Sequence, residues 1–161
     1  MLLYTNCTTP LGPALLASDG TALTGLWLAG QKYAPTDLTA RAVFAPEHPL
    51  FRQAEDWLHA YFAGERPGPD ALPLNPQGTL FQHRVWTLLR AIPYGRTVTY
   101  GQLARQLGET MAPQAVGGAV GRNPILLVIP CHRVVGADGS LTGYAAGVER
   151  KRWLLEHEGA L

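Results

Sequence analysis

A proline-rich stretch at residues 66–78, RPGPDALPLNPQG, is the feature that most limits what this chain can fold into. Its four prolines lack backbone donors and have a fixed φ, so neither a helix interior nor a central strand can run through it. We interpret the stretch as a linker at the end of a first lobe, residues 1–78, and before a second lobe, residues 79–161. A chain of 161 residues suffices for one ordinary domain or for two small lobes that share a core.

The first lobe has the pattern of strands followed by one amphipathic helix. Apolar runs at Leu2–Tyr4 and Thr21–Leu28 are typical of strands, and Leu11–Pro13 is typical of a turn. A polar connection follows at residues 31–49. From Leu50 to Phe62 the apolar residues recur with the helical period until a glycine ends the pattern.

The second lobe contains two capping boxes, at residues 79–82 and 99–102, in each of which a threonine precedes a glutamine by three positions. Each begins an apolar helical pattern, and Pro113 begins a further short helix. Two short helices joined by a tight turn predict a helix-turn-helix. The run 125–129 predicts a buried strand, and residues 149–158 predict a closing helix. We therefore expect an α+β protein with a strand-rich N-terminal lobe and a mostly helical C-terminal lobe.

The helix that begins at Pro113 has a small face, with Ala115, Gly117 and Gly118 close together. Each glycine costs about 1 kcal/mol of helix stability relative to alanine. One interpretation is that a partner approaches the backbone closely here, and the other is close packing against a neighbouring helix. The sequence leaves both open.

Composition excludes several classes of protein. With 47% apolar and 16% charged residues the chain forms a core and is not disordered. It has no apolar run long enough for a membrane span and no secretory signal, so we expect a cytoplasmic protein. Two cysteines cannot form a disulfide framework or a four-cysteine zinc site. Residues 1–78 contain four Lys or Arg and seven Asp or Glu, against nine and five in residues 79–161, so a polyanion would meet the second lobe.

Cys131 stands in the segment PCHR, directly after the apolar run. An ordinary thiol, with a pKa of about 8.5, is mostly protonated at neutral pH and needs a base to become a nucleophile. We expect the proline to bend the chain and expose the thiol. His132 is the candidate base and would act through a water molecule, because neighbours on an extended strand point to opposite faces. The carboxylate behind the imidazole would be Glu156 or Glu158, and the spacing does not choose between them.

In their order along the chain, the segments IPYGRTVTYGQLA, AVGGAVGRNP, PCHRVVGADGSLTGYAAG and KRWLLEHEG resemble the O6-alkylguanine-DNA alkyltransferases, also called methylated-DNA–protein-cysteine methyltransferases. The resemblance covers residues 79–159, and agreement is weaker around TTPLGPALLASDG. It implies DNA repair by irreversible transfer of an alkyl group, such as methyl, from O6 of guanine to a cysteine of the protein. O4 of thymine is a second candidate donor. Each molecule reacts once, and no metal or organic cofactor is implied.

The resemblance also implies roles for individual residues. Cys131 corresponds to the alkyl acceptor, His132 to the base and Glu158 to the carboxylate behind it. Asn123 corresponds to an asparagine that orders the turn beside the cysteine, and Tyr100 to a tyrosine that helps to protonate the departing guanine. The residues implied to bind DNA or line the base pocket are Gln114, Ala115, Gly118, Arg122, Arg133, Val134, Tyr144 and Ala145.

Two positions depart from the family pattern. Gln114 stands where the family usually has an arginine that fills the gap left by the flipped base, so we expect weaker DNA binding. Ala146 stands where the family often has glycine, and its methyl group would narrow the pocket.

The expected partner is double-stranded DNA that contains O6-alkylguanine, bound by a monomer without sequence specificity and with the base rotated out of the duplex. The nearest alternative is an alkyltransferase-like lesion-binding protein, although such proteins usually replace the acceptor cysteine. A cysteine hydrolase would turn over repeatedly and would need no helix-turn-helix. A DNA-binding regulator would commonly dimerise on a symmetric site.

Overall fold

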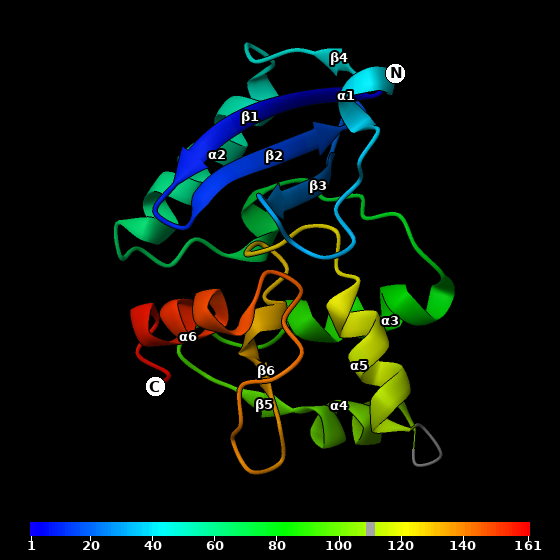
Figure 1. The fold of residues 1–161 in the computed structure, drawn as a ribbon, viewed down its shortest axis with the longest axis vertical. Coiled ribbons are helices and arrows are strands. Elements are labelled where there is room, and N and C mark those ends of the chain that lie inside the picture. Colours follow the sequence, from blue (N-terminus) through cyan, green and yellow to red (C-terminus); the bar gives the residue numbers. More distant parts are fainter. Residues whose placement is uncertain (109–111) are drawn as a thin grey trace. The chain divides into compact units, whose positions relative to one another are not determined.

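In the computed structural model, which describes residues 1–108 and 112–161, the chain forms two compact units. The first comprises residues 1–77 and 124–126, and the second comprises residues 78–123 and 127–161. The first contains a sheet and the second is mostly helical (Figure 1), which confirms the predicted fold class. Within the described residues, no helix has the length and apolar character needed to cross a bilayer.

The first unit is built on a four-stranded sheet in the order β3-β2-β1-β4. Its strands are β1 (Leu3–Thr9), β2 (Gly12–Ser18), β3 (Leu23–Leu28) and β4 (Val43–Phe44). β1 and β2 form an antiparallel hairpin, and β4 runs parallel to β1. The sequence analysis did not predict β2, because its sequence GPALLAS contains no β-branched residue and includes a proline.

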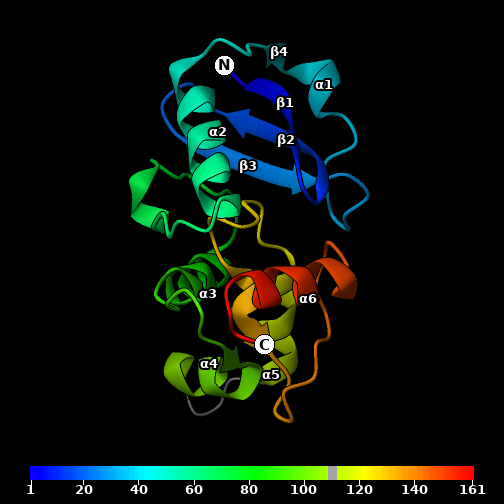
Figure 2. The same cartoon turned by 90° about the vertical axis from the view of Figure 1, so that its left-hand side faces the viewer.

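Helix α2 (Pro49–Phe62) covers one face of this sheet (Figure 2) and confirms the predicted helix. It begins with Pro49 at the first helical position and with His48 Nδ1 accepting a hydrogen bond from Leu50 N at 3.2 Å. The residues that it buries are Leu50, Phe51, Ala54, Trp57, Leu58 and Tyr61. The connection before it, predicted only to be polar, contains the short helix α1 (Leu38–Arg41) and β4.

The proline-rich stretch packs onto the first unit. It contains one 3₁₀ turn, η1 (Pro69–Ala71). Farther along, Leu23 N donates to Pro73 O and Asn75 N donates to Leu23 O, both at 2.8 Å. These two bonds attach the stretch to the first residue of β3 and pair two of its backbone groups, Pro73 O and Asn75 N.

The second unit contains the two helices of the predicted helix-turn-helix and a two-stranded parallel sheet. The turn predicted between these helices includes residues 109–111, which lie outside the described residues. The elements of the second unit are α3 (Leu80–Arg90), β5 (Val98–Thr99), α4 (Tyr100–Leu107), α5 (Pro113–Gly121), η2 (Cys131–Arg133), β6 (Val134–Val135) and α6 (Val148–His157). Both predicted capping boxes are confirmed, before α3 and before α4. Helices α4 and α5 pack together, and the buried Trp86 ties α3 to α5 by donating from Nε1 to Ala119 O at 2.9 Å.

The prediction of a strand over residues 125–129 is wrong. Ile125 makes a single bridge to Leu26, and the following residues form a turn in which Leu127 has a φ of 72°. All five residues are buried, as the apolar run required. An apolar run of this length indicates burial but does not fix the backbone conformation. The segment PCHR follows this turn.

Candidate active site

Cys131 begins η2, a single 3₁₀ turn that follows Pro130. Cys131 N donates to Ile129 O at 2.8 Å, and Arg133 N donates to Pro130 O at 3.1 Å. A 3₁₀ turn separates successive side chains by about 120°, so the cysteine and the next residue do not point to opposite faces as they would on a strand. The expectation that the proline would expose the thiol is wrong, because Cys131 is only 2% exposed.

Asn123 holds this turn from inside the protein. Its Nδ2 donates to Ile129 O at 2.7 Å, and its side chain also hydrogen bonds to the cysteine. Burial raises the pKa of Cys131 to about 11, while the bond to Asn123 and the positive charge of Lys151 act to lower it. The structure therefore places Asn123 where the resemblance implied, beside a thiol that needs a base to ionise.

His132, the expected base, is paired with Glu158. His132 Nε2 lies 2.6 Å from Glu158 Oε2, and neither side chain has any exposure. Glu156, the alternative that the spacing left open, is exposed. With Nε2–H donating to the carboxylate, Nδ1 carries the lone pair, and this buried nitrogen has no hydrogen-bond partner within residues 1–108 and 112–161. Burial lowers the pKa of His132 although Glu158 opposes the effect, so the imidazole is neutral and able to take a proton.

The structure gives Arg133 buried partners within the protein, in a place that does not favour the expected contact with DNA. Arg133 is 7% exposed, and its guanidinium forms two hydrogen bonds with Glu158, from Nε at 2.7 Å and from Nη2 at 3.1 Å. Nη1 donates to Ile92 O at 2.7 Å. A guanidinium that is buried and bonded in this way cannot reach a phosphate without breaking the ion pair.

Lys151 is a functional candidate that the sequence analysis missed. It is fully buried in α6, and its Nζ donates to Thr142 O at 2.9 Å. The Tyr100 hydroxyl donates to the same carbonyl at 3.2 Å, so one oxygen ties the segment after β6 to both α4 and α6. The sequence could have identified this lysine by its spacing from Leu154, Leu155 and Glu158. That spacing places it on the buried face of the helix.

Tyr144 and Val134 lie in the same buried region. The Tyr144 ring meets the His132 ring edge-on, with centroids 6.5 Å apart. Its hydroxyl is buried and has no hydrogen-bond partner among the described residues, and burial raises its pKa well above the usual value. Val134 is fully buried, Ala145 is partly exposed and Ala146 is buried. An unpaired buried hydroxyl marks a place where a polar ligand atom would be stabilised.

The outward side of α5 is polar or small. Val116, Ala119 and Val120 face the core, whereas the exposed residues are Pro113, Gln114, Ala115 and Gly118, followed by Arg122 at the C-cap. A hollow of about 370 Å³ lies beside this helix and is lined by Tyr100, Pro113, Gln114, Gly117, Thr142 and Gly143. Residues of α4 and α5 thus border the hollow, which also borders Thr142, whose carbonyl Tyr100 and Lys151 share.

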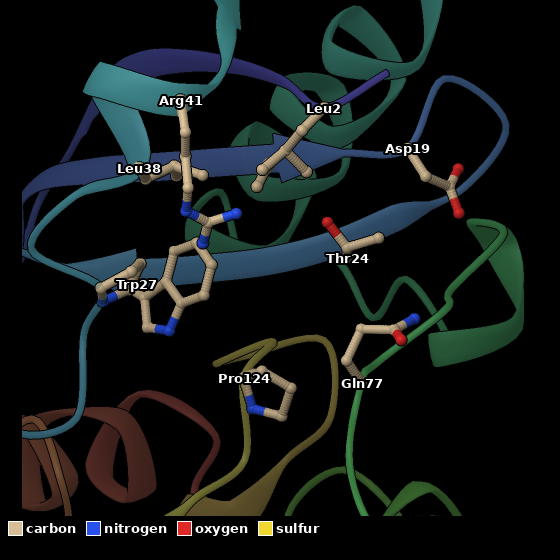
Figure 3. A pocket seen from close by; sticks show the side chains of 10 residues that line it. Leu2, Asp19, Thr24, Trp27, Leu38, Arg41, Gln77 and Pro124 are labelled. Carbon is tan, nitrogen blue, oxygen red and sulfur yellow. The ribbon is translucent and has the colours of Figure 1, made fainter.

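A larger hollow, of about 460 Å³, lies in the first unit beside Trp27 and Arg41 (Figure 3). Its charged groups already have partners, since Arg41 Nε pairs with Asp37 at 3.2 Å and Asp19 accepts hydrogen bonds from Thr21 and Asn75. None of its lining residues is a cysteine or histidine. We therefore do not assign the chemistry to it.

Comparison with known proteins gives a consistent result for both halves of the chain. Residues 80–160 match the family model "6-O-methylguanine DNA methyltransferase, DNA binding domain", and residues 2–76 match "6-O-methylguanine DNA methyltransferase, ribonuclease-like domain". A methylated-DNA–protein-cysteine methyltransferase of Mycobacterium tuberculosis is 48% identical over 158 residues, which cover 98% of this chain and 93% of that protein. One of Haemophilus influenzae is 42% identical over 157 residues, covering 98% and 86%.

A solved structure of Mycobacterium tuberculosis OGT in complex with DNA has a TM-score of 0.88 to this chain. It is 46% identical, and the likeness covers 98% of this chain and 93% of the solved one.

Proposed function

Because this chain belongs to the 6-O-methylguanine DNA methyltransferase family and repairs DNA by alkyl transfer to a cysteine, we propose that Cys131 is that cysteine. The observation that carries the proposal is the buried hydrogen bond between His132 and Glu158, at 2.6 Å, with His132 next to Cys131 in the turn η2. It supplies a base and a group that fixes the tautomer of the base.

The other cysteine, Cys7, lies in a less suitable environment. Burial and the negative charge of Glu55 both raise its pKa, to about 11. Burial has a similar effect at Cys131, but there the bond to Asn123 and the charge of Lys151 favour the thiolate. A negative neighbour opposes formation of a thiolate, and a positive neighbour supports it.

The proposed reaction begins when the thiol proton of Cys131 passes to His132 Nδ1, whose imidazolium is then stabilised by Glu158. The thiolate attacks the alkyl carbon on O6, so the S–C bond forms as the C–O6 bond breaks, and the electron pair of that bond stays on the guanine. We assign to Tyr100 the proton that neutralises the leaving base. The product is a thioether, which has no proton to lose and cannot be regenerated by these residues, so each molecule reacts once.

DNA is the partner, and we propose that it binds on the exposed side of α5. Gln114, Ala115, Gly118 and Arg122 form this side, and its small residues suit close approach to the minor groove. Contacts to the backbone would hold the duplex without reading its sequence, as repair of scattered lesions requires. The alkylated base would rotate out of the duplex and enter beside Tyr100.

Within the protein, the proposed base pocket is lined by Val134, Tyr144 and Ala145, and the methyl group of Ala146 narrows it. The buried hydroxyl of Tyr144 is available to a polar atom of the base. We further propose a monomer that acts in the cytoplasm. A thiol that must remain reduced until its single reaction requires a reducing compartment. By this proposal, residues 79–161 carry the chemistry and residues 1–78 support them.

The proposal is tested by peptide mapping after reaction with a duplex that carries one O6-methylguanine. We expect the peptide containing Cys131 to gain one CH2 group, because a methyl replaces the thiol hydrogen, and the peptide containing Cys7 to keep its mass. The Cys7→Ala variant serves as the matched control and should react normally. Modification of Cys7 would contradict the assignment. An unmodified protein bound to an intact lesion would favour the lesion-binding alternative.

A further inference from the structure

The reaction described above leaves one buried charge without a role, the guanidinium of Arg133. Glu158 Oε1 accepts from Arg133 Nε at 2.7 Å, and Oε2 accepts from Arg133 Nη2 at 3.1 Å. The same Oε2 is the atom that meets His132 Nε2 at 2.6 Å. One carboxylate is therefore shared between a guanidinium and the imidazole that acts as the base.

Arg133 is itself fixed on two further sides. Its Nη1 donates to Ile92 O at 2.7 Å, and its guanidinium carbon lies 5.6 Å from the centre of the Tyr94 ring. A planar guanidinium held at three donors leaves the carboxylate little freedom to rotate. Arg133 thus constrains the orientation of Glu158 toward the imidazole.

The charges of His132, Glu158 and Arg133 balance only when the imidazole is neutral. Glu158 and Arg133 then cancel each other, whereas a protonated His132 would leave one net positive charge in a region without solvent. Lys151, the other cation whose charge acts on this imidazole, opposes protonation in the same direction, and Glu158 favours it. The remaining neighbours, Cys131 and Tyr144, are neutral while protonated.

We propose that Arg133 is a positioning residue that orients Glu158 against His132 and keeps the imidazole unprotonated before the reaction. Without the guanidinium, Glu158 would be a buried carboxylate whose charge is best balanced by a protonated His132. An imidazole that already holds a proton on each nitrogen cannot take the proton of the thiol. The inference rests on the proposed role of His132 as the base.

The test is an NMR titration of the His132 side chain in protein labelled at histidine, with the signal assigned by its loss in His132→Gln. We expect Arg133→Met to raise the pKa of His132 by about one unit or more. Arg133→Lys, which keeps the charge, should shift it less. Arg152→Met removes an exposed arginine of α6, the helix that Glu158 caps, and should leave the pKa of His132 unchanged. A folded Arg133→Met protein with an unchanged His132 pKa would overturn the proposal.

The rate of methyl transfer provides a second readout. In Arg133→Met it should fall most at pH 6.5 and recover toward the wild-type rate at higher pH, where the imidazole loses its extra proton. An equal loss at every pH would indicate a purely structural role and contradict the inference. The titration needs neither DNA nor transfer, so a failure of the inference is separable from a failure of alkyl transfer to Cys131.

If Arg133→Met does not fold, the comparison moves to Glu158→Gln with and without Arg133→Met. Removing both members of a buried ion pair is tolerated far better than removing one. The pKa of His132 should be higher in the double variant, because only the single variant retains an uncompensated guanidinium beside the imidazole. Equal pKa values in the two proteins would overturn the proposal.

Discussion

Gly118 provides a test of why helix α5 has so small a face. An added Cβ at this position would meet no atom within 4 Å, and Gly118 is exposed. Close packing inside the described part of the protein therefore does not explain this glycine. Alanine is favoured over glycine in a helix interior by about 1 kcal/mol, and nothing around Gly118 offsets the gain. Gly118→Ala should raise the free energy of unfolding by about 1 kcal/mol in urea denaturation.

A larger side chain at Gly118 should damage DNA binding instead. If the duplex approaches the backbone of α5, a leucine side chain must be accommodated in that contact, and overpacking a close contact costs about 1–3 kcal/mol. Gly118→Leu should then weaken binding to a duplex with O6-methylguanine by about fivefold or more while the protein stays folded. Gln53→Leu, which places the same side chain on the exposed side of α2, is the control. Wild-type affinity in Gly118→Leu, or a loss of stability in Gly118→Ala, would refute this reasoning.

Three further predictions concern the DNA contact and the buried cluster. Gln114→Arg should bind duplex DNA more tightly and steepen the dependence of log K on log salt by about one, measured by fluorescence anisotropy; an unchanged slope would contradict a contact to phosphate. Glu158→Gln should slow methyl transfer about 100-fold or more. It should also lower the free energy of unfolding by about 3 kcal/mol, because Arg133 loses its buried partner. Wild-type values in both assays would contradict the pairing of Glu158 with His132 and Arg133. Because the pKa of His132 is lowered in the folded state, stability should fall below pH 6.5 by up to about 1.4 kcal/mol per pH unit in urea unfolding, with a smaller slope in His132→Gln.

Local signals in the sequence predicted much of this fold. The capping boxes before α3 and α4 and the proline at the start of α5 use short-range hydrogen bonding and backbone geometry, which a few residues determine. The strand predicted at residues 125–129 is wrong because apolar side chains indicate only burial, and a turn can be as buried as a strand. The sequence did not predict β2 because the strand depends on pairing with β1 and β3, which stabilises a segment of low strand propensity.

The sequence likewise predicted some residues of the candidate site and not others. The segment PCHR and the resemblance led to Cys131 and His132, and the structure shows the bond between His132 and Glu158. The contacts of Arg133 depend on a carboxylate 25 positions away, so the sequence did not reveal them, and the resemblance placed Arg133 among the residues that bind DNA or line the base pocket. The sequence analysis also missed Lys151. Buried lysines are rare, and its partner is a backbone carbonyl, which the sequence does not identify.

The most direct test of the account is the intact mass of the protein titrated with a duplex that carries one O6-methylguanine. We predict that wild type and Cys7→Ala each gain one CH2 group, that the gain stops at one per protein molecule, and that Cys131→Ala gains none. A gain in Cys131→Ala, or lesions repaired in excess of the protein present, would contradict irreversible transfer to Cys131.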